Sequence, residues 1–182
     1  MIYRLIYFCA FITLASTTML AQSETDLRLG IGFSFLGSGD LYAVMLENEL
    51  NHTLNDYFTL SGNIGYGRSN NGVFEAASFL QGNANIFFSP LKNIRRNDLR
   101  IGGGLSYCNI SDAFQVSGLF RDGGQELAVY ALDQRTALGF NIIIENTIDL
   151  SDRFLLGIKA FTQPYLNGDI NSGILMKFGV KF

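Results

Sequence analysis

The feature that most constrains this chain is an alternation of large apolar residues with small or polar ones, which recurs along most of its length. Its first instance sets Leu27, Leu29, Ile31, Phe33 and Phe35 between Arg28, Gly30, Gly32 and Ser34. Successive side chains of a β-strand point to opposite faces, so a period of two is the period of a strand. The pattern therefore predicts a strand with one apolar face and one small or polar face.

The same alternation recurs often enough to predict about eight strands. Composition agrees, because 20 Gly, 16 Phe and 8 Tyr against 2 Pro and no Trp favour short strands joined by turns over a helical bundle. Beyond the N-terminal stretch, no apolar run approaches the length of about 18 residues that a transmembrane helix needs. We expect an all-β fold with strands near 27–35, 41–51, 57–67, 78–88, 98–108, 135–147, 153–163 and 172–182.

The two strand faces decide whether such a barrel lies in water or in lipid. A soluble ligand-binding barrel would turn the apolar face inward, around a cavity. In lipid the apolar face points outward, and only a sheet without edges satisfies its backbone. Here the other face is too charged for a ligand cavity, so we predict a closed antiparallel up-and-down transmembrane β-barrel. Its predicted interior network consists of Arg28, Glu47, Glu49, Arg100, Glu145, Lys159 and Lys177.

The N-terminus predicts export. Residues 1–21 hold one charge, Arg4, then an apolar stretch and small residues before Ala21. This is the pattern of a secretory signal peptide, with cleavage after Ala21 and a barrel domain at 22–182. An uncleaved anchor helix is the alternative, which the short apolar stretch and the polar residues after it disfavour. We expect an outer-membrane protein of a Gram-negative cell, with Cys108 as the one cysteine left, packed and inert.

The end of the chain alternates most regularly. Ile174, Met176, Phe178, Val180 and the terminal Phe182 are separated by Leu175, Lys177, Gly179 and Lys181. This segment resembles the C-terminal signal by which the barrel assembly machinery recognises outer-membrane β-barrel proteins. An ordinary edge strand that ends in Phe is the alternative.

With its strand number and length, the chain resembles the small OmpA-like and OmpX-like outer-membrane barrels. The resemblance implies a partner in the barrel assembly machinery during biogenesis and outer-membrane lipid around the folded barrel. We expect no peptidoglycan-binding domain of the OmpA type, because none follows Phe182.

Candidate catalytic and ligand-binding residues are few. The resemblance also includes lipid A deacylases, which are small outer-membrane barrels with a His-x-Ser motif. The single histidine, His52, lacks that spacing, and we expect it in a periplasmic turn. Glu47 and Glu49 share a face, but an ion-pair network explains them better than a metal site does. We therefore expect no enzyme activity, cofactor or metal. A net charge of −3 without a basic patch argues against nucleic-acid binding.

The connections predict where a partner would bind. We expect external connections at 36–40, 68–77, 109–134 and 164–171. The segment 109–134 is too apolar for a simple loop, so either the flanking strands extend into it or a short helix forms near 125–133. We expect a structural or surface-interaction role, with a surface ligand at 109–134. The alternatives are a narrow OmpW-like channel for small apolar molecules and, more remotely, a lipid A-modifying enzyme.

Overall fold

The computed structural model describes residues 24–37, 41–70, 75–91, 96–122 and 125–182. The signal peptide predicted at 1–21 lies outside the described residues. In the described part of the chain, no helix is long and apolar enough to cross a membrane.

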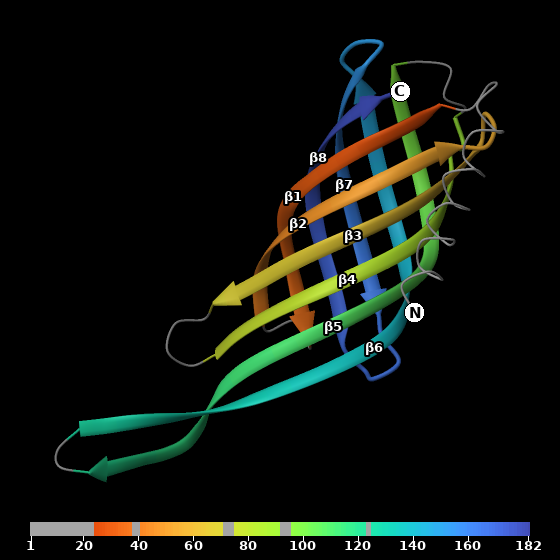
Figure 1. Ribbon diagram of the computed structural model, residues 1–182. Helices are drawn as coiled ribbons and strands as arrows, with labels where there is room; N and C mark the ends of the chain where they lie inside the picture. Colours follow the sequence, from red (N-terminus) through yellow and green to blue (C-terminus); the bar gives the residue numbers. More distant parts are fainter. Residues whose placement is uncertain (1–23, 38–40, 71–74, 92–95, 123–124) are drawn as a thin grey trace, which may run out of the picture.

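The described strands form one closed antiparallel barrel, in which each strand pairs with its neighbours in sequence and β1 pairs with β8 (Figure 1). This confirms the predicted all-β, up-and-down barrel of eight strands. The strands are β1 (Thr25–Gly37), β2 (Leu41–Thr53), β3 (Phe58–Asn70), β4 (Glu75–Phe88), β5 (Asn97–Asp122), β6 (Gln125–Asp149), β7 (Phe154–Pro164) and β8 (Ile170–Lys181).

The predicted strands are present, but most reach further toward the end of the barrel away from the termini. The connections predicted at 36–40 and 68–77 shorten accordingly, since β1 ends at Gly37 and β3 ends at Asn70. Backbone pairing explains the difference, because each added residue pair satisfies donors and acceptors that a loop would leave to water.

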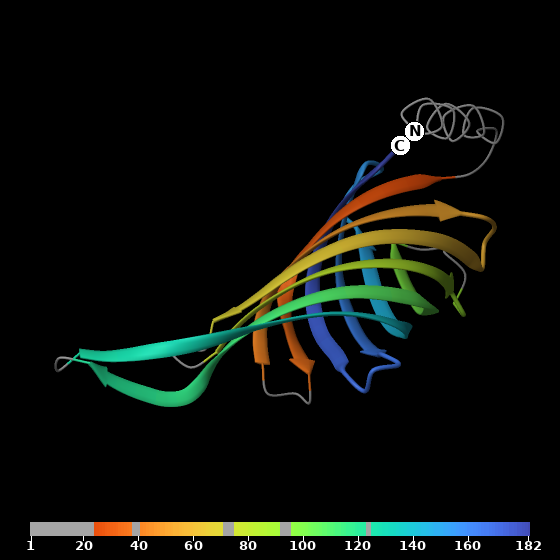
Figure 2. The ribbon, with the colours of Figure 1, turned by 60° about the horizontal axis from the view of Figure 1, so that its bottom comes forward.

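For the connection 109–134, the structure decides between the two predicted alternatives, extended strands and a short helix. β5 and β6 continue through this segment as one hairpin, paired from Asn97 with Ile148 to Asp122 with Gln125. The register shifts between Val116 and Phe120, which marks a β-bulge or irregularity in the hairpin. The alternative of extended strands is therefore correct and the helix near 125–133 is not. Figures 1 and 2 show the hairpin projecting well past the rim of the barrel.

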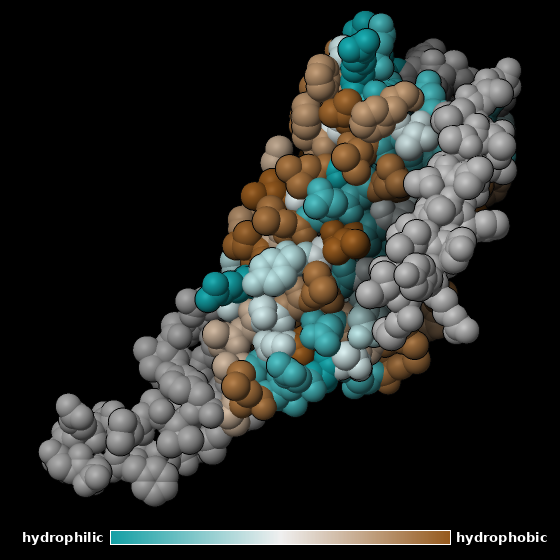
Figure 3. Space-filling model, in the orientation of Figure 1, coloured by the Kyte–Doolittle hydropathy of each residue, from teal (hydrophilic) through white to brown (hydrophobic). Residues whose placement is uncertain are grey.

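The outer face of the wall is apolar from strand to strand. Large apolar side chains point outward and remain between about one third and two thirds exposed along each strand, as Leu29 (55 %) and Ile142 (57 %) illustrate. Figure 3 shows apolar side chains over much of the near wall, with polar ones at its upper and lower ends and a few between. A surface of this kind is stable against hydrocarbon and is not expected against water.

Aromatic rings lie at both ends of this apolar band. At the end that carries the termini, the Phe58 and Phe88 rings lie 5.5 Å apart, and those of Phe154 and Phe178 lie 5.7 Å apart. Toward the opposite end, Tyr42 stacks on Phe33 at 5.1 Å. Aromatic girdles at both membrane–water boundaries are typical of transmembrane barrels.

A charge placed on the outer face separates a membrane barrel from a soluble one. We expect Ile142→Arg to lower the free energy of unfolding by roughly 2–4 kcal/mol, because Ile142 lies midway along the outward row of β6. Urea unfolding in phospholipid vesicles, followed by circular dichroism, measures this loss.

The matched control for that substitution is Leu166→Arg, in the connection between β7 and β8, where the native side chain is 76 % exposed. This control should leave the free energy of unfolding nearly unchanged. Equal and small effects of both substitutions would contradict the membrane assignment, since a soluble protein tolerates either one to within about 0.5 kcal/mol.

Candidate functional site

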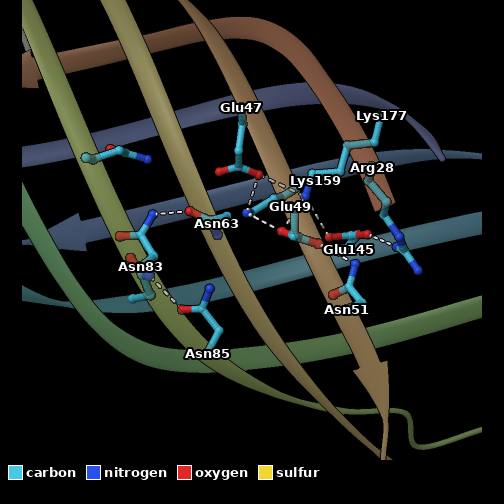
Figure 4. A network of polar contacts seen from close by, with 12 residues as sticks. Arg28, Glu47, Glu49, Asn51, Asn63, Asn83, Asn85, Glu145, Lys159 and Lys177 are labelled. Atoms are coloured by element: carbon cyan, nitrogen blue, oxygen red, sulfur yellow. Dashed lines mark hydrogen bonds and ion pairs between the residues drawn. The ribbon is translucent and has the colours of Figure 1, made fainter. Parts of the chain in front are cut away.

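The structure brings all seven predicted interior residues into one network inside the barrel. They come from six strands, and Figure 4 shows six of them, all but Arg100, with their side chains turned toward one another inside the barrel. None of the seven is more than 3 % exposed. The residues are Arg28 on β1, Glu47 and Glu49 on β2, Arg100 on β5, Glu145 on β6, Lys159 on β7 and Lys177 on β8.

Two lysines and two glutamates form one half of the network. Lys159 Nζ lies 2.7 Å from Glu47 Oε1 and 3.0 Å from Glu49 Oε2. Lys177 Nζ lies 2.9 Å and 2.5 Å from the same two oxygens. Each ammonium group therefore bridges both carboxylates. β2 is thereby tied across the interior to β7 and β8.

Two arginines form the other half. Arg100 Nη2 lies 2.9 Å from Glu145 Oε1 and 3.2 Å from Glu49 Oε1, so Glu49 joins the two halves. Arg28 donates a hydrogen bond to Glu145. It also donates to both carboxylate oxygens of Asp26, and its Nη2 lies 2.9 Å from Asp26 Oδ2. The guanidinium of Arg100 also lies 4.1 Å from the centre of the Phe87 ring.

Asp26 is a member of the network that the sequence analysis missed. It is only 8 % exposed and accepts hydrogen bonds from Arg28 and Asn51. The signal was present, because Asp26 shares the parity of Arg28 on the same strand. The strand predicted at 27–35 begins one residue after Asp26 and therefore leaves it out.

The formal charges of this buried network balance. Four acids, Asp26, Glu47, Glu49 and Glu145, face four bases, Arg28, Arg100, Lys159 and Lys177. A buried charge without a partner is costly, whereas a neutral, hydrogen-bonded cluster is tolerated. The network therefore fills this part of the barrel with side chains whose charges offset one another.

Side-chain amides continue the interior toward the end opposite the termini. Asn83 Nδ2 donates to Asn63 Oδ1 at 2.5 Å, and Asn141 Nδ2 donates to Asn85 Oδ1 at 2.6 Å. Further along, Asn171 Nδ2 donates to Gln81 Oε1 at 2.9 Å. Amides can donate and accept at once, so such pairs close without a net charge.

Beyond the amides the inner face becomes apolar, which the sequence analysis did not predict. Buried there are Leu36, Leu41, Met45, Phe79, Ile110 and Leu175. A Cβ atom at Gly67 would lie 2.2 Å from the Phe79 ring, so this glycine makes the space that the ring fills. Cys108 is fully buried in the same cluster, as predicted for a packed thiol. These side chains form an apolar plug, which lies on the side of the charged network that faces away from the termini.

A group of aspartates surrounds one arginine at the mouth beyond this plug. The Arg135 guanidinium lies 2.6 Å from Asp112 Oδ2, 2.9 Å from Asp169 Oδ2 and 3.1 Å from Asp133 Oδ2. Among the described residues, no group of three or more His, Cys, Asp or Glu side chains is arranged to hold a metal ion. The aspartates thus act as partners of Arg135.

The predicted assembly signal lies on β8. Ile174, Met176 and Phe178 point outward and are about half exposed, whereas Lys177 points into the network. Val180 is half-buried and Phe182 is 77 % exposed. Recognition of this segment by the assembly machinery stays a prediction. His52, near the end of β2 that adjoins the termini, lies with Nδ1 3.2 Å from Thr25 Oγ1.

Comparison with solved structures places the fold among small outer-membrane barrels. The attachment invasion locus protein Ail of Yersinia pestis matches with a TM-score of 0.62 and 11 % identity, over 88 % of this chain and 99 % of that one. The N-terminal barrel domain of Pseudomonas aeruginosa OprF matches with a TM-score of 0.61 and 13 % identity, over 88 % and 100 %.

Neisserial surface protein A is similar to the same extent, with a TM-score of 0.61 and 10 % identity over 88 % of this chain and 97 % of that one. No family model and no curated protein matches the sequence. The likeness is therefore one of fold, and it confirms the resemblance to small eight-stranded outer-membrane barrels.

Breaking the network at its centre should destabilise the barrel strongly. We expect Glu49→Gln to lower the free energy of unfolding by about 3–5 kcal/mol, because it leaves buried cations without their carboxylate. Adding Lys177→Met to this variant should recover part of the loss, since the double change removes one of the orphaned charges. Urea unfolding in lipid vesicles measures all three proteins.

Asp149→Asn provides the matched control for the network variant. Asp149 Oδ2 lies 2.6 Å from Lys181 Nζ, but the two side chains are 33 % and 22 % exposed, so the loss should not exceed about 1 kcal/mol. If Glu49→Gln cost no more than Asp149→Asn, the buried network would not be a stabilising centre of the barrel.

Proposed function

We propose that this chain is an integral outer-membrane protein that binds a partner at the cell surface through the β5–β6 hairpin. The barrel would serve as a rigid, filled support, and the hairpin as the binding element. The observation that carries the proposal is the length of the hairpin beyond the strands that flank it.

The flanking strands stop well before the hairpin does. β4 begins at Glu75, which pairs with Phe114, so the described pairing of β5 with β4 goes no further toward the tip. β7 pairs with β6 continuously only from Ile142, apart from one isolated bridge between Gly139 and Tyr165. Beyond these points the described ladders join β5 and β6 only to each other.

Such a hairpin presents two outer backbone edges. The edge of a sheet offers rows of N–H and C=O groups, onto which an extended polypeptide can add as a further strand. A hairpin that projects past the rim offers those edges away from the lipid. This supports an extended segment of another protein as the ligand of the segment 109–134.

The filled interior favours this role over that of a narrow channel. The charged network, the amide layer and the apolar plug follow one another along the barrel, and many of their side chains are buried. An eight-stranded barrel is just wide enough for its own side chains to fill. The OmpW-like channel therefore remains the second candidate, without a described passage to support it.

We also propose that the chain acts without catalysis. The single histidine in the sequence, His52, is near the end of β2 that adjoins the termini, and its described side-chain partner is Thr25. A nucleophile and a carboxylate would both have to lie beside it for acyl-transfer chemistry of the serine–histidine type. The interior carboxylates, by contrast, are engaged by lysines and arginines.

Shortening the hairpin tests the proposal. We expect replacement of residues 115–130 by an Asn-Gly turn to leave a folded barrel, because Phe114 and Ala131 pair and can flank a two-residue turn. Cells that display this variant should lose binding of a fluorescent unfolded polypeptide, such as reduced and carboxymethylated α-lactalbumin. Cells with the unaltered chain should bind it.

Conductance in planar bilayers distinguishes the second candidate. The proposal predicts no steady single-channel conductance from the unaltered chain or from the variant with the shortened hairpin. Equal binding of the polypeptide by both proteins would contradict the surface role, and a conductance that the shortened hairpin changes would favour the channel.

A further inference from the structure

A single amide lies on the lipid-facing side of the barrel at mid-depth. Asn48 points outward from β2 and is exposed, between the outward side chains of Leu46 and Leu50. Along the strand it is about 20 Å from Tyr42 and about 14 Å from His52, at a rise of about 3.4 Å per residue. Its side chain makes no hydrogen bond within the part of the chain that the structure describes.

This position is unlike that of the other outward polar groups. Thr162 and Ser172 satisfy each other, with their hydroxyl oxygens 2.8 Å apart. Other outward amides are Asn97 and Asn109 on β5 and Asn146 on β6. Asn97 and Asn146 lie near the end that adjoins the termini, and Asn109 lies beyond Tyr107, toward the opposite end. Hydrocarbon offers an amide neither donor nor acceptor, so Asn48 needs a polar partner from another molecule.

A groove opens beside Asn48 on the same face. It is an open depression of about 620 Å³, lined mainly by residues of β3, β4 and β5 and bordered by Leu27 of β1. Gly62 and Gly82 leave it open, because a Cβ atom added at either glycine would meet no other atom within 4 Å. Its walls are apolar and include Leu50, Ile64, Ala84, Leu105, Tyr107 and Leu138.

The opposite side of Asn48 carries large aliphatic side chains. β1, the other neighbour of β2, presents Leu29 and Ile31 outward, with 55 % and 56 % of each side chain exposed. Leu29 is paired directly with Asn48. One side of the amide thus carries branched side chains, and the other lies open over Gly62 and Gly82.

We propose that this face binds a second copy of the same chain, with a two-fold axis along the membrane normal passing close to Asn48. Such an axis places the two Asn48 side chains at the same depth, where each amide donates to and accepts from the other. The rotation also exchanges the two sides of the amide. It therefore sets Leu29 and Ile31 of each copy against the groove of its partner.

A lipid chain is the competing occupant of the groove. An acyl chain could fill the hollow, but at mid-depth it carries no group that can hydrogen-bond Asn48. Close packing of small residues combined with a polar pair is the arrangement that stabilises contacts between proteins in lipid. The self-pairing amide beside the open glycines Gly62 and Gly82 favours the second copy, independently of the role proposed for the hairpin.

Cysteine cross-linking in outer membranes of a Gram-negative expression host tests the dimer. In a Cys108→Ala background, Leu46→Cys keeps Asn48 and places a thiol close to the proposed axis. We expect oxidation with copper phenanthroline to give a band of twice the monomer mass. The control is Ile158→Cys on β7, which is 56 % exposed on the far side of the barrel and should give none.

Two further substitutions in the Leu46→Cys background separate the occupants. Asn48→Leu removes the amide, and Gly82→Leu fills the groove; both should abolish the cross-link while the mobility shift on heating shows a folded barrel. Leu50→Cys repeats the test should Leu46→Cys fail to fold. A cross-link that survives Asn48→Leu would show that the amide does not hold the contact. A cross-link of equal yield at residue 158 would show that the contact is not specific to this face. Either result would overturn the proposal.

Discussion

Closure of the sheet by pairing β1 with β8 is the constraint on which the rest of the structure depends. A strand in hydrocarbon cannot leave backbone groups unpaired, so the wall must return to its first strand. The continuous register from Asp26 with Lys181 to Gly37 with Ile170 achieves this. Once the wall is closed, alternation turns each strand residue either to the lipid or to the interior. The charged side chains of the network therefore lie in the interior.

The charged interior follows from closure. Eight strands enclose a space that side chains can fill, and acids opposite bases fill it without net charge. Glu49 illustrates the principle, because it accepts hydrogen bonds from Arg100, Lys159 and Lys177, which come from three other strands. The network therefore connects strands that do not pair with one another. The two proposed recognition surfaces, the hairpin edges and the face around Asn48, both lie on the outside of the barrel.

Much of this could be predicted from the sequence because a period of two assigns faces directly. Parity alone placed Arg28, Glu47 and Lys159 in the interior. It could not say which charges would meet, since Arg28 is paired in register with Glu49 yet bonds to Asp26 and Glu145. Apolar residues such as Phe79 on the inner face, and the length of the β5–β6 hairpin, depend on packing and pairing across strands, which parity does not encode.

The most direct test of the account is the heat modifiability of the protein in outer-membrane fractions. Unheated and boiled samples are compared on a denaturing gel. A closed barrel held by its interior network should resist the detergent until it is heated, so the unheated protein should migrate at a different position from the boiled one. Recovery of the protein in the soluble fraction, with the same mobility before and after boiling, would contradict the transmembrane barrel.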